Sequence, residues 1–340
     1  MCEDVIDKCL CKKSLVGQGS PCRRYSLMRP LVIGVGAGVS IGVCLALCVR
    51  RRRACPFIDG GLNKDTQVCI SLAKRPSNIG TRFHNFLYAE LGLDFLYKAF
   101  TTSDIKGAID GMRALGFRGC SVSMPFKEDV IALVDEMDKT AAAIQSVNTI
   151  VNTGGILKAY NTDYGAVAEL IAKHDLDNTA LVVIQGSGGM AKACGAAFRD
   201  SGFTAGVVLA RNESTGRALA TELHFEWRSL SAATDSPSSS LLSGSWSGAI
   251  LVNVTPIGMR GTDELALAFP EAMIQSAKAI FDVVAFPSET PLIRMARKHG
   301  RPVITGAEVI ALQAAKQFEL YTGVQPTADQ VLRASIYSRQ

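Results

Sequence analysis

Three short segments, far apart in the chain, carry residue types that could do chemistry together. Residues 121–127 (Ser-Val-Ser-Met-Pro-Phe-Lys) end in a lone lysine, residues 161–163 (Asn-Thr-Asp) end in a carboxylate, and residues 186–191 (Gly-Ser-Gly-Gly-Met-Ala) are a glycine-rich turn. A neutral lysine can accept the proton of a hydroxyl as hydride leaves the same carbon, and a neighbouring carboxylate can orient both groups. Lys127 and Asp163 beside a nucleotide-binding turn therefore indicate hydride transfer coupled to proton transfer at a secondary alcohol.

The glycine-rich turn follows the apolar run Leu181–Ile184 and precedes a helical pattern, which is the context that a dinucleotide site requires. In the G-x-G-x-x-G/A pattern, Gly186 permits the tight turn, Gly188 lets the backbone approach the pyrophosphate, and Ala191 allows close packing of helix on sheet. The helix N-terminus adds free N–H groups and a partial positive charge. The predicted cofactor-binding residues of this turn are Gly186, Ser187, Gly188, Gly189, Met190 and Ala191.

The end of the next predicted strand, Ala210-Arg211-Asn212, indicates which dinucleotide binds. An Asp or Glu here would accept hydrogen bonds from the ribose hydroxyls of NAD, but the first acidic residue, Glu213, comes one position too late. The planar, always-charged guanidinium of Arg211 suits the 2′-phosphate of NADP. We therefore expect NADP, with Arg211 and Asn212 in its site. The alternative is that Arg211 is a solvated residue at a strand end.

Composition limits the class of protein. The chain has 340 residues, of which 48% are hydrophobic and 20% charged, enough for two globular domains with large cores. Residues 1–61 hold ten basic and four acidic residues, whereas the whole chain has a net charge of +5, so residues 62–340 have a net charge of −1 and give no case for nucleic-acid binding. Seven of the ten cysteines also precede residue 62. The three that remain are scattered and make no disulfide framework, which predicts a reduced, intracellular core. The four histidines are spread singly, so we expect no metal.

Residues 1–61 form an N-terminal extension with two interpretations. Pro30–Val49 has no charged residue and is long enough to span a bilayer, and Arg50–Arg53 would hold the following chain on the cytoplasmic side. The alternative is that these residues are translated upstream sequence and that the true start lies near residue 62. The sequence therefore predicts cytoplasmic enzyme domains, with a membrane tether only if residues 30–49 are a real span.

From Leu62 onward, short apolar runs alternate with helical patterns. This alternation predicts an α/β fold with a mostly parallel sheet and helices on both faces. Ser103 is the expected N-cap of one helix, and residues 229–248, rich in Ser and Gly, are an expected surface loop. The expected strands are Thr66–Ser71, Phe95–Phe100, Gly119–Ser123, Leu181–Ile184, Val207–Leu209, Ile250–Val252 and Ala279–Phe281. The expected helices are Gly80–Leu91, Asp104–Leu115, Tyr164–His174, Ala307–Tyr321 and Thr327–Ser338.

The order of these segments resembles the shikimate dehydrogenase family, from about Leu62 to near the end of the chain. Residues 121–127 are similar to the family's N-V-T-x-P-x-K, with serine at two positions, and residues 252–259 are similar to its Asn-x-Thr-Pro-x-Gly-Met loop. The resemblance implies two domains. An N-terminal α/β substrate domain would comprise residues 62–164 plus 307–340, and a Rossmann-type NADP-binding domain with a parallel sheet would comprise residues 165–306.

The resemblance also implies roles for single residues. Lys127 would lie at the substrate hydroxyl with Asp163 on its other side, and the family's arginine at position 211 would face the 2′-phosphate of NADP. Asn148 and Gln313 would offer amides to the substrate. The remaining expected site residues are Ser77, Asn78, Thr81 and Ser123 for the substrate, and Thr255 and Met259 near the nicotinamide.

Departures from the family pattern bear on the substrate. The family's Ser-x-Ser, which holds the shikimate carboxylate, is not intact in Arg75-Pro-Ser-Asn-Ile-Gly-Thr81, and the family's pocket tyrosine falls at Ala285. The pattern resembles most the shikimate dehydrogenase-like branch. The expected reaction is the NADP-dependent interconversion of shikimate and 3-dehydroshikimate. The alternatives are quinate dehydrogenase and a catalytically silent dinucleotide- or metabolite-binding protein. No oligomeric state is predicted.

Overall fold

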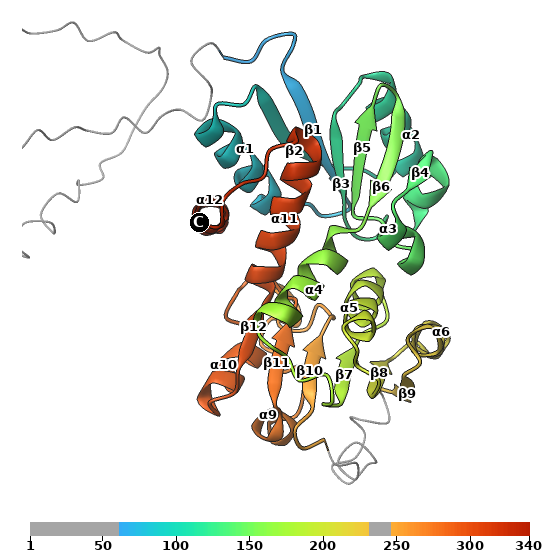
Figure 1. The fold of residues 1–340 in the computed structure, drawn as a ribbon, viewed down its shortest axis with the longest axis vertical. Coiled ribbons are helices and arrows are strands. Elements are labelled where there is room, and N and C mark those ends of the chain that lie inside the picture. Colours follow the sequence, from blue (N-terminus) through green and yellow to red (C-terminus); the bar gives the residue numbers. More distant parts are fainter. Residues whose placement is uncertain (1–60, 231–245) are drawn as a thin grey trace, which may run out of the picture. The chain divides into compact units, whose positions relative to one another are not determined.

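The computed structural model describes residues 61–230 and 246–340, which form two six-stranded sheets with helices packed on them (Figure 1). The α/β prediction is confirmed, and all seven expected strands are present. The first sheet contains β1 (Gln67–Ala73), β2 (Phe95–Thr101), β3 (Gly119–Val122), β4 (Glu136–Met137), β5 (Thr149–Thr153) and β6 (Ile156–Tyr160). The second contains β7 (Val182–Gln185), β8 (Gly206–Ala210), β9 (Glu226–Ser229), β10 (Ile250–Asn253), β11 (Ala279–Asp282) and β12 (Val303–Thr305).

Helices connect the strands, and the five expected ones each end within two residues of the predicted position. The predicted N-cap of α2 is wrong: Asp104, not Ser103, caps this helix, because its carboxylate accepts a hydrogen bond from the Gly107 N–H. The helices are α1 (Ile79–Leu91), α2 (Ile105–Ala114), the 3-10 helix η1 (Asp129–Leu133), α3 (Lys139–Ile144), α4 (Thr162–Lys173), α5 (Gly189–Asp200), α6 (Glu213–Leu223), α9 (Glu271–Ser276), α10 (Pro291–Lys298), α11 (Gly306–Thr322) and α12 (Ala328–Ser338).

The first sheet is mixed, with strand order β2-β1-β3-β5-β6-β4. β1 is parallel to both β2 and β3, whereas β5 runs antiparallel to β3 and to β6. The hairpin of β5 and β6 was not predicted. Its two-residue turn consists of Gly154 and Gly155, whose φ angles of +61° and +93° lie in the region that glycine adopts without strain. The hairpin matters for the site because β5 begins directly after Asn148.

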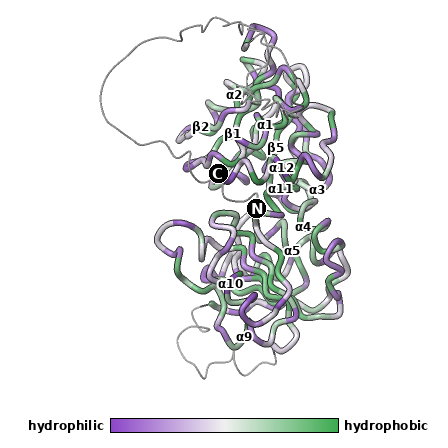
Figure 2. Tube along the Cα trace, turned by 90° about the vertical axis from the view of Figure 1, so that its left-hand side faces the viewer, coloured by the Kyte–Doolittle hydropathy of each residue, from purple (hydrophilic) through white to green (hydrophobic). Residues whose placement is uncertain are grey.

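The second sheet is entirely parallel, with strand order β12-β11-β10-β7-β8-β9. This is the doubly wound order, in which the direction of winding changes between β7 and β10 and a crevice opens at the carboxyl ends of those strands. Every residue of β7, β8, β10 and β11 is buried, and Figure 2 shows hydrophobic segments running through the interior of this part of the molecule. Helices on both sides shield the strands from water.

The two C-terminal helices return to the first sheet. α11 packs against α4 and α1 and touches β5, and α12 packs along α1 (Figure 1). Phe318 and Tyr321 of α11 belong to the same buried cluster as Phe83 and Leu87 of α1. The end of the chain therefore completes the core that the first third of the described chain began.

The candidate membrane span, residues 30–49, and most of the expected surface loop lie outside the described residues. Within the described ranges, no helix is both long and apolar enough to cross a membrane. Cys69, Cys120 and Cys194 are buried free thiols.

Candidate active site

Lys127 and Asp163 form an ion pair whose side chains are largely buried. Lys127 Nζ lies 2.5 Å from Asp163 Oδ2, and the side chains are 16% and 9% exposed. The structure thus brings together two residues that the sequence placed in separate segments, 36 positions apart. Because water is largely excluded, the attraction between the two charges is stronger than it would be on the surface. The pair is a candidate for proton transfer.

The turn after β3 fixes the position of Lys127. The Phe126 N–H donates to the Ser123 carbonyl at 3.1 Å, and the Phe126 side chain is buried in the core beside β3. The Val147 N–H donates to the Lys127 carbonyl at 2.8 Å. The backbone is therefore held directly before and at the lysine, so that its side chain leaves the turn in a defined direction.

Asp163 lies in the first turn of α4, where a carboxylate is favoured by the helix dipole. Asn161 caps this helix, since its Oδ1 accepts a hydrogen bond from the Tyr164 N–H at 3.1 Å. The Asn161 Nδ2 donates to the Ser146 carbonyl at 2.7 Å. The cap therefore ties the start of α4 to the segment that also holds the backbone of Lys127.

Asn148 and Gln313, the two predicted amides, are neighbours although they lie 165 positions apart. Asn148 Nδ2 lies 3.4 Å from Gln313 Oε1 and 3.0 Å from Thr162 Oγ1, and Asn148 Oδ1 accepts a hydrogen bond from the Thr162 N–H at 2.9 Å. Asn148 is 2% exposed, and its hydrogen bonds are made within the protein. Contact of either amide with substrate stays a prediction.

The other predicted substrate residues lie at the carboxyl ends of β1 and β3. These strands are parallel with Leu72 opposite Val122, so the segments that follow them meet at one edge of the sheet. Ser123 is exposed there, and its N–H donates to the Leu72 carbonyl at 3.0 Å. Ser77 and Asn78 are exposed just before α1, and Thr81 is half-buried in its first turn. Asn78 makes no side-chain capping bond.

The glycine-rich turn has the geometry that a pyrophosphate requires. Gly186 has a φ of +127°, and a Cβ there would lie 2.8 Å from Val254 Cγ2, so only glycine fits without displacing the neighbour. A Cβ on Gly188 would meet nothing within 4 Å, so the space before the turn is open. α5 begins at Gly189, and its first N–H groups face this space without helical partners. The residues of the turn therefore fit a dinucleotide phosphate.

The turn also touches the Lys127 segment directly. A Cβ on Gly189 would lie 3.0 Å from Ser146 Oγ and 3.4 Å from Lys127 Cδ. Lys192, one turn along α5, pairs with Glu128 at 2.7 Å. A nucleotide bound at α5 would therefore lie close to the lysine.

Arg211 and Asn212 follow β8 at the same edge of the second sheet. Arg211 is exposed and forms no ion pair with another described residue, and the neighbouring Glu213 pairs with Arg217 instead. The Asn212 side chain is engaged as the N-cap of α6, where it accepts a hydrogen bond from the Thr215 N–H at 3.1 Å. Ser187 Oγ lies 2.8 Å from Thr215 Oγ1, which joins the glycine-rich turn to α6.

Thr255 and Met259 lie on the loop after β10, and a buried polar pair shapes that loop. Asn253 Oδ1 accepts hydrogen bonds from Thr255 N–H at 3.1 Å and Thr255 Oγ1 at 2.6 Å. Asn253 Nδ2 donates to Asp282 Oδ1 on the neighbouring strand at 3.0 Å. Burial raises the pKa of Asp282 to about 6, although hydrogen bonds, led by that from Thr290, act in the opposite direction. The Met259 side chain is 40% exposed.

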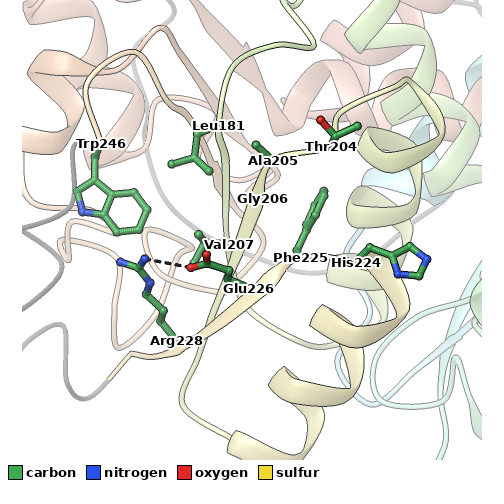
Figure 3. A pocket seen from close by; sticks show the side chains of 10 residues that line it. All are labelled: Leu181, Thr204, Ala205, Gly206, Val207, His224, Phe225, Glu226, Arg228 and Trp246. Atoms are coloured by element: carbon green, nitrogen blue, oxygen red, sulfur yellow. Dashed lines mark hydrogen bonds and ion pairs between the residues drawn. The ribbon is translucent and has the colours of Figure 1, made fainter.

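A cavity of about 500 Å³ lies at the opposite, amino ends of β7, β8 and β9 (Figure 3). Its lining includes Phe225, Trp246 and the ion-paired Arg228 and Glu226. None of the predicted site residues lines it. Since ligands of doubly wound sheets bind at the carboxyl ends of the strands, we do not assign the reaction to this cavity.

Comparisons with known proteins agree with this geometry. Residues 79–150 match the family model of the shikimate dehydrogenase substrate-binding domain. A shikimate dehydrogenase-like protein of Haemophilus influenzae is 52% identical over 279 residues, covering 82% of this chain and 98% of that protein. The NADP(+) shikimate dehydrogenase of Archaeoglobus fulgidus is 36% identical over 262 residues, covering 76% and 93%. The solved shikimate 5-dehydrogenase of Thermus thermophilus, in complex with NADP(H) and shikimate, superposes with a TM-score of 0.68 at 26% identity, covering 80% of this chain and 99% of that one. The chain therefore belongs to the shikimate dehydrogenase family.

Proposed function

We propose that the protein is an NADP-dependent oxidoreductase that interconverts a secondary alcohol and a ketone on a shikimate-like cyclic hydroxy acid. The observation that carries the proposal is the largely buried Lys127–Asp163 pair, 2.5 Å apart. A surface ion pair would contribute little and would need no particular position. This pair instead lies where the glycine-rich turn approaches the substrate lobe, since the position of a Gly189 Cβ is 3.4 Å from Lys127 Cδ.

NADP+, when bound, would be the hydride acceptor for alcohol oxidation. The protein's own residues would handle the proton: the neutral amine of Lys127 accepts the hydroxyl proton of the substrate, and the Asp163 carboxylate, in contact with the same nitrogen, stabilises the ammonium that forms. In the reverse direction the ammonium returns the proton to the ketone oxygen, so that protons and electron pairs balance.

For the division of labour, we propose a substrate domain of residues 62–164 plus 307–340 and a nucleotide domain of residues 165–306. The packing of α11 on α1 and β5 supports the return of the chain to the first lobe. Gly186–Ala191 would hold the pyrophosphate, Arg211 the 2′-phosphate, and Thr255 and Met259 would lie beside the nicotinamide. Ser77, Asn78, Thr81, Ser123, Asn148 and Gln313 would contact the substrate.

Shikimate is the substrate we propose first, because a relative with 36% identity is named an NADP(+) shikimate dehydrogenase. Quinate is the second candidate, because the chain has Asn78 and Gly80 in the region of the family's serine pair and Ala285 in place of its tyrosine. Gly80 and Ala285 are smaller than the serine and the tyrosine, and leave more room for a saturated ring with an extra hydroxyl. Turnover of both acids therefore distinguishes the two activities.

The test is steady-state kinetics of the full chain with shikimate or quinate and NADP+ or NAD+. We expect Lys127→Ala to lower kcat by roughly two to four orders of magnitude, with a smaller change in the KM of the acid. Lys139→Ala is the matched control, because Lys139 is an exposed lysine on α3 outside the site. Near-normal turnover by Lys127→Ala would refute the proton-transfer role. Absence of turnover by the parent with either acid would refute the proposed activity and favour a protein that only binds dinucleotide.

Residues 1–61 are proposed to be dispensable for this activity, since every site residue follows them. Residues 62–340 should turn over the acids as the full chain does. If residues 30–49 tether the protein, the full chain should sediment with membranes and residues 62–340 should not. An inactive 62–340 fragment beside an active full chain would contradict the first expectation.

A further inference from the structure

Gln317 lies one helical turn after Gln313 on α11 and is only 3% exposed. No sequence motif singled it out, and the proposed reaction uses none of its atoms. Its amide nevertheless connects three elements. Oε1 accepts a hydrogen bond from Ser121 Oγ on β3 at 3.0 Å, and Nε2 donates to Thr149 Oγ1 on β5 at 2.9 Å. A buried amide with partners at both ends has one stable orientation.

The β3 end of this connection is fixed by tyrosines. Tyr97 OH donates to Ser121 Oγ at 2.8 Å, and Tyr321 OH lies 3.0 Å from the same oxygen. With its oxygen accepting from Tyr97, Ser121 directs its single hydrogen at Gln317 Oε1. The Gln317 amide oxygen therefore faces β3, and its nitrogen must face β5.

At the β5 end, Thr149 connects Gln317 to Asn148, one of the predicted site residues. Thr149 has one hydroxyl hydrogen, and because its oxygen accepts from Gln317, that hydrogen points at Asn148 Oδ1, 2.8 Å away. The Thr162 N–H donates to the same Asn148 oxygen. Asn148 Nδ2 is thereby turned towards Gln313 Oε1. The amide nitrogen of Gln313 is left without a protein partner in the described part of the chain.

We propose that Gln317 is a positioning residue of the active site. Through Thr149 it sets how the Asn148 and Gln313 amides are turned, and it holds the first turn of α4, which carries Asp163. Gln313 then keeps an N–H donor for the substrate, which suits the hydroxyl and carboxylate oxygens of a hydroxy acid. The kinetic consequence of this inference rests on the proposed function, whereas the structural consequence does not.

The test uses three variants of the full chain. Gln317→Met keeps the length of the side chain and removes its hydrogen bonds with Ser121, Thr149 and the Asn148 carbonyl. Thr149→Val breaks the same connection from β5, and Thr149→Ser keeps the hydroxyl. Asn152→Ala is the matched control, because it removes another buried amide of β5 whose Oδ1 instead accepts a hydrogen bond from the Gly155 N–H in the hairpin turn.

In kinetics with shikimate and NADP+, we expect Gln317→Met and Thr149→Val each to lower kcat about three- to tenfold, with the KM of NADP+ unchanged. The double variant should be no worse than the poorer single variant, because both break one connection. Thr149→Ser should retain the parent's kcat. Independent, multiplying losses in the double variant would overturn the proposal.

A second measurement needs no turnover. The Thr162 N–H donates to Asn148 Oδ1, and this hydrogen bond should slow its exchange with solvent. We therefore expect NMR to show the Thr162 amide exchanging about tenfold faster in Gln317→Met, and not in Asn152→Ala. If the parent turns over neither acid, the proposed function fails while this measurement still decides the role of Gln317. Unchanged protection of Thr162 in Gln317→Met would overturn the positioning role. If Gln317→Met does not fold, Thr149→Val tests the same link, with the same result expected.

Discussion

His84 gives the sharpest test of how the helices pack on the first sheet. Its side chain is fully buried, and its ring stacks on Tyr97 with centroids 4.3 Å apart and an interplanar angle of 10°. Gln317 lies near the ring, but its nitrogen donates to Thr149, and neither His84 nitrogen makes a hydrogen bond of ordinary geometry within the described residues. Burial lowers the pKa of His84 from 6.5 to about 3, because an imidazolium there would lose its hydration.

This shift makes the free energy of unfolding depend on pH. The folded-state pKa lies below the unfolded-state value, so the stability that neutral His84 contributes is present above about pH 6.5 and is lost as the pH falls towards 3. Between those values the unfolded chain binds a proton that the folded chain does not. The cost of that difference is about 2 kcal/mol at pH 5 and about 3 kcal/mol at pH 4, relative to pH 8.

Replacing His84 by leucine removes the titrating group and keeps an apolar side chain of similar volume. We expect urea unfolding to show that the parent loses about 2 kcal/mol more than His84→Leu between pH 8 and pH 5. Other groups titrate equally in both proteins and cancel in the comparison. Phe83→Leu is the control, because it disturbs the same cluster without titrating and should shift stability equally at both pH values. A parent and a His84→Leu variant with parallel pH profiles would refute a buried neutral imidazole.

Three further predictions follow from the site. Arg211→Ala should weaken NADP binding about ten- to a hundredfold in a fluorescence titration and leave NAD binding little changed, and equal losses would contradict the 2′-phosphate contact. Gly189→Ala should lower kcat about three- to tenfold, because its Cβ would lie 3.0 Å from Ser146 Oγ and displace the segment that holds Lys127. The double variant Gly189→Ala, Ser146→Ala should recover most of the loss, and a double variant as slow as the single one would argue against that contact. Asp282→Asn should remove a fall in stability of about 2 kcal/mol that the parent shows as pH rises from 4 to 7, since the raised folded-state pKa favours the folded protein only below about 6. Denaturant unfolding at the two pH values checks this, and an unchanged profile would count against it.

Much of the fold could be predicted because its signals are local. Each strand of the second sheet that is buried on both faces is a short apolar run, and the glycine pattern marks the turn after β7. Lys127 and Asp163 could be singled out for the same reason, as one follows a predicted strand and the other directly precedes a predicted helix. The 2.5 Å distance between Lys127 Nζ and Asp163 Oδ2 could not be predicted in this way. It depends on how the segment after β3 and the start of α4 are placed in the folded protein, and no local sequence pattern contains that information.

The hairpin of β5 and β6 does have a local signal in the sequence. Gly154-Gly155 between two short segments rich in apolar residues is typical of a two-residue hairpin turn. The Ser103 prediction failed because two adjacent residues can both cap a helix, and the carboxylate of Asp104 is the one that reaches the Gly107 N–H.

Gln317 could not have been recognised from the sequence. A helical period of 3.6 places Gln313 and Gln317 on one face of α11, but it does not tell what that face meets. An amide in a helix is usually exposed, and this one is buried because Ser121, 196 positions away, and Thr149, 168 positions away, supply its two partners. A side chain that needs both partners in place is stable only after β3, β5 and α11 have assembled. Polar groups of this kind are therefore the last part of a site to be predicted, although they decide how the residues that a motif does reveal are oriented.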